Sequence, residues 1–123
     1  MAHILIIDDE EIARYTLREI LESENHRVTE AADGVEAGKI FRRESFDLVI
    51  TDIIMPDKEG LETIREFKQF RPETPIIAIS GGGRFRTDAY LKFAEELGAD
   101  HTLNKPFTDD DLLALVKTCL GGS

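Results

Sequence analysis

Residues 4–9 read ILIIDD, an apolar run that ends in two aspartates, and this stretch decides the fold. Three later runs have the same form: LVI leads into Thr51-Asp52, IIAI into Ser80, and HTLN into Lys105-Pro106. If these runs are parallel strands, the polar residues that follow them meet at one edge of one sheet. Ligands of open α/β sheets bind in the crevice at that edge. The pattern therefore predicts a site together with a fold.

Strand-like runs alternate along the whole chain with stretches whose apolar residues recur at helical spacing. The runs 4–7, 48–50 and 76–79 are nearly all apolar, as in central strands covered on both faces, whereas HRVTE at 26–30 alternates like an edge strand. Right-handed crossovers then favour a doubly wound, five-stranded parallel sheet of order 2-1-3-4-5, a flavodoxin-like (βα)5 fold of the α/β class. The expected strands are His3–Ile7, Arg27–Glu30, Leu48–Thr51, Ile76–Ser80 and His101–Asn104.

Polar and glycine residues mark the ends of the expected helices. Asp33-Gly34 opens the helix after the second strand, and Thr108 with Asp111 resembles a capping box at the start of the last helix. Gly98 lies where the helix before the fifth strand should end. These signals agree with the alternation of strands and helices.

Composition limits the class of protein. With 123 residues, 41% of them hydrophobic, we expect residues 1–123 to form a single domain without an output domain. A formal charge of −10 argues against direct binding to nucleic acid or to anionic membranes. The lone Cys119 excludes an intrachain disulfide and fits a buried core thiol. Since no apolar run is long enough to span a bilayer or to form a signal peptide, we expect a soluble cytoplasmic protein.

Three carboxylates should converge at the switch point of the predicted sheet. Asp8 and Asp9 follow the first strand, and Asp52 follows the neighbouring third strand. Such a cluster is usually tolerated because it binds a hard divalent cation, here Mg²⁺ with Mn²⁺ as an alternative ion. The competing interpretation is a solvated acidic turn that places negative charge at a helix N-terminus.

Ser80 and Lys105 favour a phosphoryl site over a bare metal site. A phosphoryl group in transfer needs positive charge and a hydroxyl or amide donor at its oxygens. Both residue types follow strands of the predicted sheet. A carboxylate held beside Mg²⁺ and a lysine stays ionised and can attack phosphorus, which gives an aspartyl-phosphate.

With these residues in place, the chain resembles the receiver domain of two-component response regulators. The resemblance runs from ILIIDDE through LVITDIIMPDKEG and PIIAIS to NKPF and covers essentially the whole chain. It implies that Asp52 is the phosphoacceptor and that Asp8 and Asp9 position Mg²⁺. It also implies that Ile54 offers its backbone carbonyl to the metal.

The resemblance assigns the remaining polar residues as well. Lys105 would pair with the phosphoryl group, Ser80 would be the switch hydroxyl, and Lys105-Pro106 would be a cis peptide. Met55-Pro56 and Gly60 match the family's loop after the acceptor, where glycine permits a turn before the next helix.

Two segments depart from the family pattern. Thr102 stands three residues before Lys105, where the family usually has an inward-swinging Tyr or Phe, so the usual aromatic relay is not expected. Glycines at 81–83 are followed by Arg84-Phe85-Arg86. Successive glycines raise the entropy lost on ordering, so we hypothesise that phosphorylation orders this loop.

The resemblance also implies a role and partners. The chain would be a signalling switch that takes a phosphoryl group from a histidine kinase or a histidine phosphotransfer protein. It would catalyse its own modification and later its own dephosphorylation, and would not be a turnover enzyme. An unidentified downstream protein would bind the surface formed by the helix around 90–97, the strand 101–104 and the helix around 112–120.

Three other functional classes compete with this interpretation. A haloacid-dehalogenase-like phosphatase needs a second Asp two residues after the nucleophile, where this chain has Ile54. A flavodoxin-like cofactor carrier needs a phosphate cradle after the first strand, where residues 8–11 are all acidic and would repel phosphate. A receiver-like interaction module that is never phosphorylated is opposed by the complete acidic set and Lys105.

Overall fold

A computed structural model describes residues 2–53, 59–80 and 87–121, with the side chains of residues 59 and 87–91 outside the description. Strands and helices alternate through these ranges, as the apolar pattern predicts. β2 and β3 each extend one residue beyond the expected ranges, so that Asp52 is the last residue of its strand. The elements are β1 His3–Ile7, α1 Glu11–Glu22, β2 Arg27–Ala31, α2 Gly34–Arg43, β3 Leu48–Asp52, α3 Glu59–Phe70, β4 Ile76–Ser80, α4 Thr87–Leu97, β5 His101–Asn104 and α5 Asp109–Cys119.

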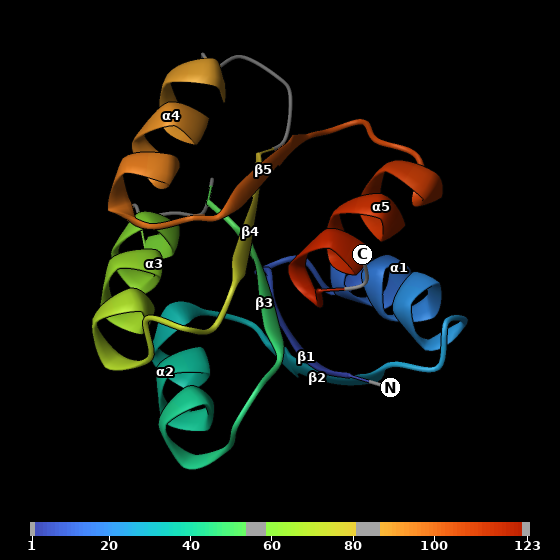
Figure 1. The fold of residues 1–123 in the computed structure, drawn as a ribbon, viewed down its shortest axis with the longest axis horizontal. Coiled ribbons are helices and arrows are strands. Elements are labelled where there is room, and N and C mark those ends of the chain that lie inside the picture. Colours follow the sequence, from blue (N-terminus) through green and yellow to red (C-terminus); the bar gives the residue numbers. More distant parts are fainter. Residues whose placement is uncertain (1, 54–58, 81–86, 122–123) are drawn as a thin grey trace.

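The strands form one parallel sheet of order β2-β1-β3-β4-β5, which confirms the doubly wound, flavodoxin-like topology. α1 and α5 cover one face of the sheet, and α2, α3 and α4 cover the other (Figure 1). β2 lies on one side of β1, and β3, β4 and β5 follow on the other side of β1. The order in which strands are added to the sheet therefore changes direction between β1 and β3. This is the switch point at which a ligand crevice is expected.

The register of the sheet brings the ends of the strands level with one another. Ile7 of β1 pairs with Thr51 of β3, and Asp52 pairs with Ile79 of β4. Ser80 in turn pairs with Asn104 of β5. The next residues in the chain, Asp8 after β1 and Lys105 after β5, therefore emerge at the same edge as Asp52 and Ser80.

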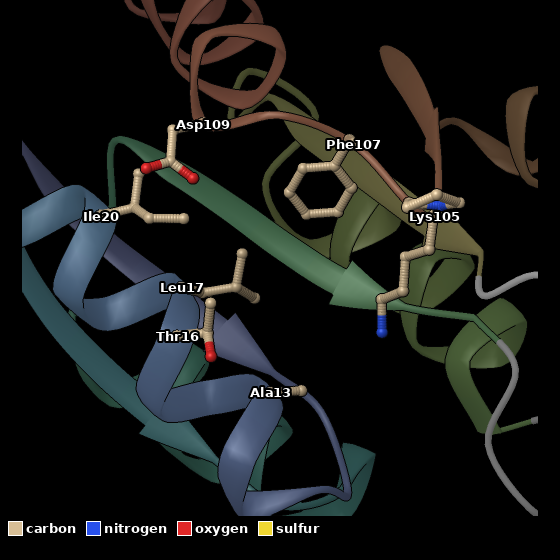
Figure 2. A pocket seen from close by; sticks show the side chains of 8 residues that line it. Ala13, Thr16, Leu17, Ile20, Lys105, Phe107 and Asp109 are labelled. Carbon is tan, nitrogen blue, oxygen red and sulfur yellow. The ribbon is translucent and has the colours of Figure 1, made fainter.

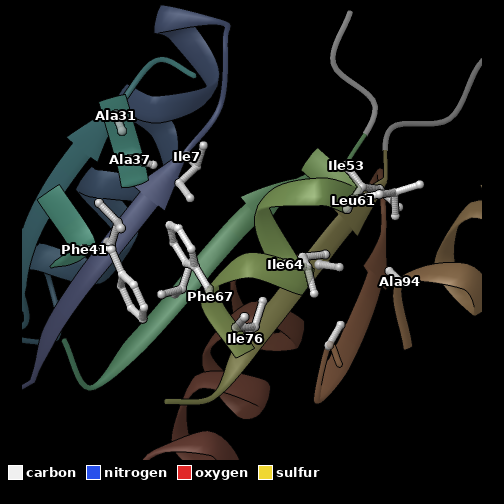
Figure 3. Close-up of a cluster of buried hydrophobic side chains, with 14 of the residues drawn as sticks. Ile7, Ala31, Ala37, Phe41, Ile53, Leu61, Ile64, Phe67, Ile76 and Ala94 are labelled. Atoms are coloured by element: carbon white, nitrogen blue, oxygen red, sulfur yellow. The ribbon is translucent and has the colours of Figure 1, made fainter. Parts of the chain in front are cut away.

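Two hydrophobic clusters, one on each face, hold the sheet in place. Every residue of β3 and β4 is buried, which explains why these runs carry almost no polar residues. On the α2–α3–α4 face, the rings of Phe41 and Phe67 stack with their centroids 4.0 Å apart (Figure 3). On the other face, Leu17 and Leu21 of α1 pack with Leu112 and Val116 of α5.

The helix ends follow the expected signals. The Asp33 side chain accepts a hydrogen bond from the Glu36 N–H and caps α2, and Thr108 forms a complete capping box with Asp111 at the start of α5. Gly98 has a φ of +125° directly after α4, a conformation that favours glycine. Cys119 is partly buried at the end of α5 and packs against the α1–α5 cluster. In the described ranges no helix combines the length and apolar character that crossing a membrane requires.

Candidate functional site

Lys105 joins two buried carboxylates at the edge where the strands end. Its Nζ lies 3.4 Å from Asp52 Oδ2 and 3.8 Å from Asp8 Oδ2. Asp52 is only 7% exposed and Asp8 only 1%. The parallel register brings these side chains together although 53 positions separate Asp52 from Lys105. The pocket thus holds two negative charges and one positive charge with little access to water.

Burial raises the pKa of Asp8 to about 6. Removal from water disfavours the charged form, and the negative charges of Asp52 and Asp9 add to this effect. The Glu10 N–H, 2.9 Å from Asp8 Oδ1, and the Lys105 ammonium act in the opposite direction. Asp8 therefore lies in a site that favours an additional positive charge.

Asp9 is exposed, whereas the other two carboxylates are buried. Within the part of the chain that the structure describes, no group of three or more Asp, Glu, His or Cys side chains is arranged to hold a metal ion. The structure thus gathers Asp8 and Asp52 of the expected triad in the buried pocket, while the negative charge of the exposed Asp9 contributes to the raised pKa of Asp8. Mutual repulsion explains this arrangement, because a third carboxylate is more stable in water than beside two others.

Ser80 places a hydroxyl group without a partner at the same edge. The side chain is fully buried, and among the described residues its Oγ finds no hydrogen-bond partner. A buried hydroxyl left unsatisfied costs about 1–3 kcal/mol. An incoming group with acceptor oxygens would remove this cost.

Gly60 allows α3 to approach the end of β3. A Cβ atom at this position would lie 2.6 Å from the Asp52 carbonyl oxygen and 2.6 Å from Ile53 Cα. Gly60 is the second residue of α3, and so it does not form the turn that the sequence suggested. Glycine is needed at this position because the backbone of α3 packs closely against the main chain of Asp52 and Ile53.

A pocket of about 430 Å³ opens between α1 and the segment that joins β5 to α5. Leu17, Ile20 and Phe107 form its apolar walls, and Thr16 and Asp109 add polar side chains to its lining (Figure 2). Lys105 also lines the pocket, with its ammonium close to the end of β3. The apolar pocket therefore adjoins the charged site and shares one residue with it.

Several sequence predictions concern the surroundings of the site. The Lys105-Pro106 peptide is cis, as the resemblance implied. Thr102 is partly buried in β5 and pairs with Ala78 of β4. A small side chain therefore stands at the β5 position where the family usually has Tyr or Phe. Ile54, Met55-Pro56 and the 81–86 loop lie outside the described residues.

Arg14 belongs to the site but was not identified from the sequence. Its Nη1 donates a hydrogen bond of 2.7 Å to the main-chain carbonyl oxygen of Asp8. One signal was present, since Arg14 is the first cation after the acidic residues 8–11. Periodicity could not show its role, because its helical position adjoins the apolar stripe of α1.

The fold, the buried acid pair and its lysine define the class of protein, and residues 4–117 match the family model of the response regulator receiver domain. The chain belongs to this family, whose members are signalling modules and not turnover enzymes.

Individual relatives agree with this assignment. The chain is 36% identical over 117 residues to the chemotaxis protein CheY of Halobacterium salinarum, with 95% of each chain covered. It is 37% identical over 120 residues to the transcriptional regulatory protein CpxR of Escherichia coli, where 98% of this chain matches 50% of that protein. A receiver domain protein from Clostridium thermocellum has a TM-score of 0.90 and 32% identity, over 98% of this chain and 95% of that one.

Proposed function

We propose that this receiver domain accepts a phosphoryl group on Asp52 from a histidine kinase or a histidine phosphotransfer protein, and that the modification changes its binding to a downstream protein. The main support is the Lys105 ammonium, which lies within 4 Å of both buried carboxylates, together with the Ser80 hydroxyl at the same edge of the sheet, for which the described residues supply no hydrogen-bond partner. This set offers a nucleophile, a cation and a hydrogen-bond donor at one edge of the sheet. These are the groups that phosphoryl transfer requires.

Asp52 is the nucleophile in this proposal. One carboxylate oxygen attacks phosphorus as the P–N bond to the donor histidine breaks. The imidazole leaves with the electron pair of that bond and, protonated on its other nitrogen, departs neutral. The product is a mixed anhydride, from which water later removes the phosphoryl group and restores the carboxylate.

Lys105 and Ser80 stabilise the phosphoryl oxygens. Lys105 moves from its contacts with the Asp8 and Asp52 carboxylates to the more highly charged phosphoryl group, where its ammonium offsets the added negative charge. The Ser80 hydroxyl donates to a phosphoryl oxygen, a hydrogen bond that no described residue provides. Both changes favour the modified state over the resting state.

Asp8 and Asp52 bring two buried carboxylates together, which supports a site for Mg²⁺. Asp8, Asp9 and Asp52 would hold the ion, together with the backbone carbonyl of Ile54. When bound, the ion supplies positive charge beside the phosphoryl oxygens. Asp8 and Asp9 would position it, and Asp52 would remain free to react through its other oxygen.

The donor protein would dock over the pocket between α1 and the β5–α5 segment. A donor histidine must come within bonding distance of Asp52, and this pocket is the apolar recess that shares Lys105 with the site. Apolar side chains from a donor helix could pack against Leu17, Ile20 and Phe107. The downstream protein would read the α4, β5 and α5 surface, with Thr102 in place of an aromatic relay.

Intact-protein mass spectrometry after incubation with Mg²⁺ and acetyl phosphate tests the phosphoacceptor. The wild type should gain one phosphoryl group that hydroxylamine removes, as expected of an acyl phosphate, and Asp52→Ala should gain none. Asp110→Ala is a matched control, because Asp110 is an exposed aspartate in the first turn of α5. It should be labelled like the wild type.

Labelling that persists in Asp52→Ala would move the acceptor to another residue. A wild type that takes up no label would favour the alternative of an interaction module that is not regulated by phosphorylation.

A further inference from the structure

Arg14 connects the acidic pocket to the edge strand β2. Its side chain is only 15% exposed, and its Nε lies 3.1 Å from Glu30 Oε1 on β2. Its Nη1 donates to the Asp8 carbonyl oxygen at 2.7 Å. The planar guanidinium is thus held by Glu30 at one nitrogen and holds Asp8 at another.

Asp8 is fixed at three points by these contacts. Its N–H donates to the Ala31 carbonyl oxygen at 3.2 Å, its Oδ1 accepts from the Glu10 N–H at 2.9 Å, and its carbonyl oxygen accepts from Arg14. That carbonyl belongs to the peptide unit that joins Asp8 to Asp9. A peptide unit is planar, so a hydrogen bond to its oxygen restricts the rotation of the backbone on both sides.

We infer that Arg14 is a positioning residue for divalent-cation binding, a role that rests on the proposed function: it holds the main chain of Asp8 in the orientation from which the buried Asp8 carboxylate, beside Asp52, reaches the ion. Arg14 touches neither the ion nor the phosphoryl group. It acts as an outer partner of the ligands, and loss of such a partner typically weakens metal affinity by about 10- to 100-fold.

Charge alone would have the opposite effect. Arg14 is a cation near a site for another cation, so removing its charge should strengthen Mg²⁺ binding if electrostatics were its only contribution. Loss of positioning should weaken binding. The sign of the change therefore separates the two roles.

Arg18 provides a matched control on the next turn of α1. It forms ion pairs with the same Glu30 and with Glu22, but its side chain is 40% exposed and these contacts do not involve Asp8. Removal of Arg18 takes away one positive charge and one Glu30 partner, as removal of Arg14 does. It leaves the Asp8 carbonyl in contact with Arg14.

The experiment is Mg²⁺ titration calorimetry on the wild type, Arg14→Met and Arg18→Met, without phosphodonor and at one ionic strength. We expect Kd to rise about tenfold or more in Arg14→Met and to stay level or fall in Arg18→Met. Far-UV circular dichroism at the titration temperature establishes that each variant is folded. If Arg14→Met does not fold, Arg14→Lys takes its place, because it keeps the charge but lacks the fork that joins Glu30 to Asp8.

An unchanged or lower Kd in the Arg14 variant overturns the inference, and so does an equal rise in Arg18→Met. A wild type that takes up no Mg²⁺ is a different failure, since it counts against the proposed metal site itself. Mass-spectrometric labelling of Asp52 would then show whether the phosphoacceptor proposal survives on its own.

Discussion

Asp8 is the most buried carboxylate of the pocket, and its protonation should couple stability to pH. Its pKa is raised from 3.8 to about 6, chiefly by burial. The folded state therefore binds this proton more tightly than the unfolded chain does. The contribution to stability is complete below about pH 4 and is lost as pH rises through about 6, a difference of up to about 3 kcal/mol.

Asp8→Asn should remove this dependence, because asparagine keeps the shape and the acceptor for the Glu10 N–H but carries no charge. Without divalent cations, we expect the variant to exceed the wild type in free energy of unfolding at pH 7, and this advantage to shrink toward pH 4.5. Urea denaturation at both pH values measures it. Parallel pH profiles for the two proteins would show that Asp8 titrates normally.

Gly60 is a second position at which one atom decides the local structure. In Gly60→Ala, the new Cβ would meet the main chain of Asp52 and Ile53 at 2.6 Å, so α3 must move away from the site. We expect a loss of about 1–3 kcal/mol of stability and slower labelling by acetyl phosphate.

Gly38→Ala is the control for this substitution. Its Cβ would approach only the terminal Nη1 of Arg42, at 3.2 Å, and a flexible side chain can yield. Alanine also favours the helix over glycine by about 1 kcal/mol, so this variant should be neutral or more stable. Equal losses in both variants would indicate that contact with Asp52 is not the reason for the glycine at position 60.

The residues of the site differ in how far the sequence could predict them. Asp8, Asp52, Ser80 and Lys105 could be placed together because each lies at the end of an apolar run, and parallel strands align such ends. The exposure of Asp9 could not be predicted, since adjacent residues share a sequence signal but not an environment. Contacts to main-chain atoms, such as those of Gly60 and Arg14, depend on the packed fold, so the sequence could mark these residues but not the contacts that they make.

At the scale of elements, Arg71 ties the end of α3 to the end of α2. Its Nη1 donates to the carbonyl oxygens of Phe41 and Glu44, at 2.6 Å each. Its guanidinium also lies 5.1 Å from the ring centroid of Phe41 and 5.0 Å from that of Phe70. Carbonyl groups at a helix C-terminus lack partners within the helix, so this arginine satisfies them from a neighbouring element.

Arg71→Met should therefore lower the free energy of unfolding by about 1–3 kcal/mol, because the carbonyl groups at the end of α2 lose a charged donor. Mg²⁺ affinity and Asp52 labelling should not change, since these helix ends lie at the edge of the sheet opposite the site. Arg42→Met is the control, because Arg42 forms an exposed pair with Glu66 at 3.7 Å, worth less than about 1 kcal/mol, and its guanidinium lies 6.0 Å from the centroid of the Phe70 ring. A fall in Mg²⁺ affinity for Arg71→Met would contradict this separation.

The order of the elements could be predicted because strands and helices have different apolar periods, and because right-handed crossovers leave few topologies open. The capping roles of Asp33, Gly98 and Thr108 could be predicted because each residue acts on its own neighbours in the chain. Long-range contacts between helices, such as that of Arg71, depend on the packed fold and could not be predicted.

For the whole molecule, a net charge of −10 means that any salt should relieve some repulsion. Mg²⁺ bound at the site should add a specific increment of about 2.7 kcal/mol at a concentration 100 times Kd. Thermal unfolding with MgCl2 and with KCl at matched ionic strength separates the two effects. We expect MgCl2 to stabilise the wild type more than KCl does, and this difference between the salts to disappear in Asp8→Asn. An equal effect of both salts on the wild type would argue against a specific site.

Cys119 has a practical consequence for following this domain by spectroscopy. Burial raises the pKa of its thiol from 9.0 to about 11, so at neutral pH the reactive thiolate is roughly 100-fold scarcer than at an unperturbed cysteine. The natural thiol can therefore remain in place while Glu95→Cys, at an exposed position on α4, receives a maleimide dye. One fluorophore on the surface proposed to meet the downstream protein would then report its arrival in real time, without redesign of the core.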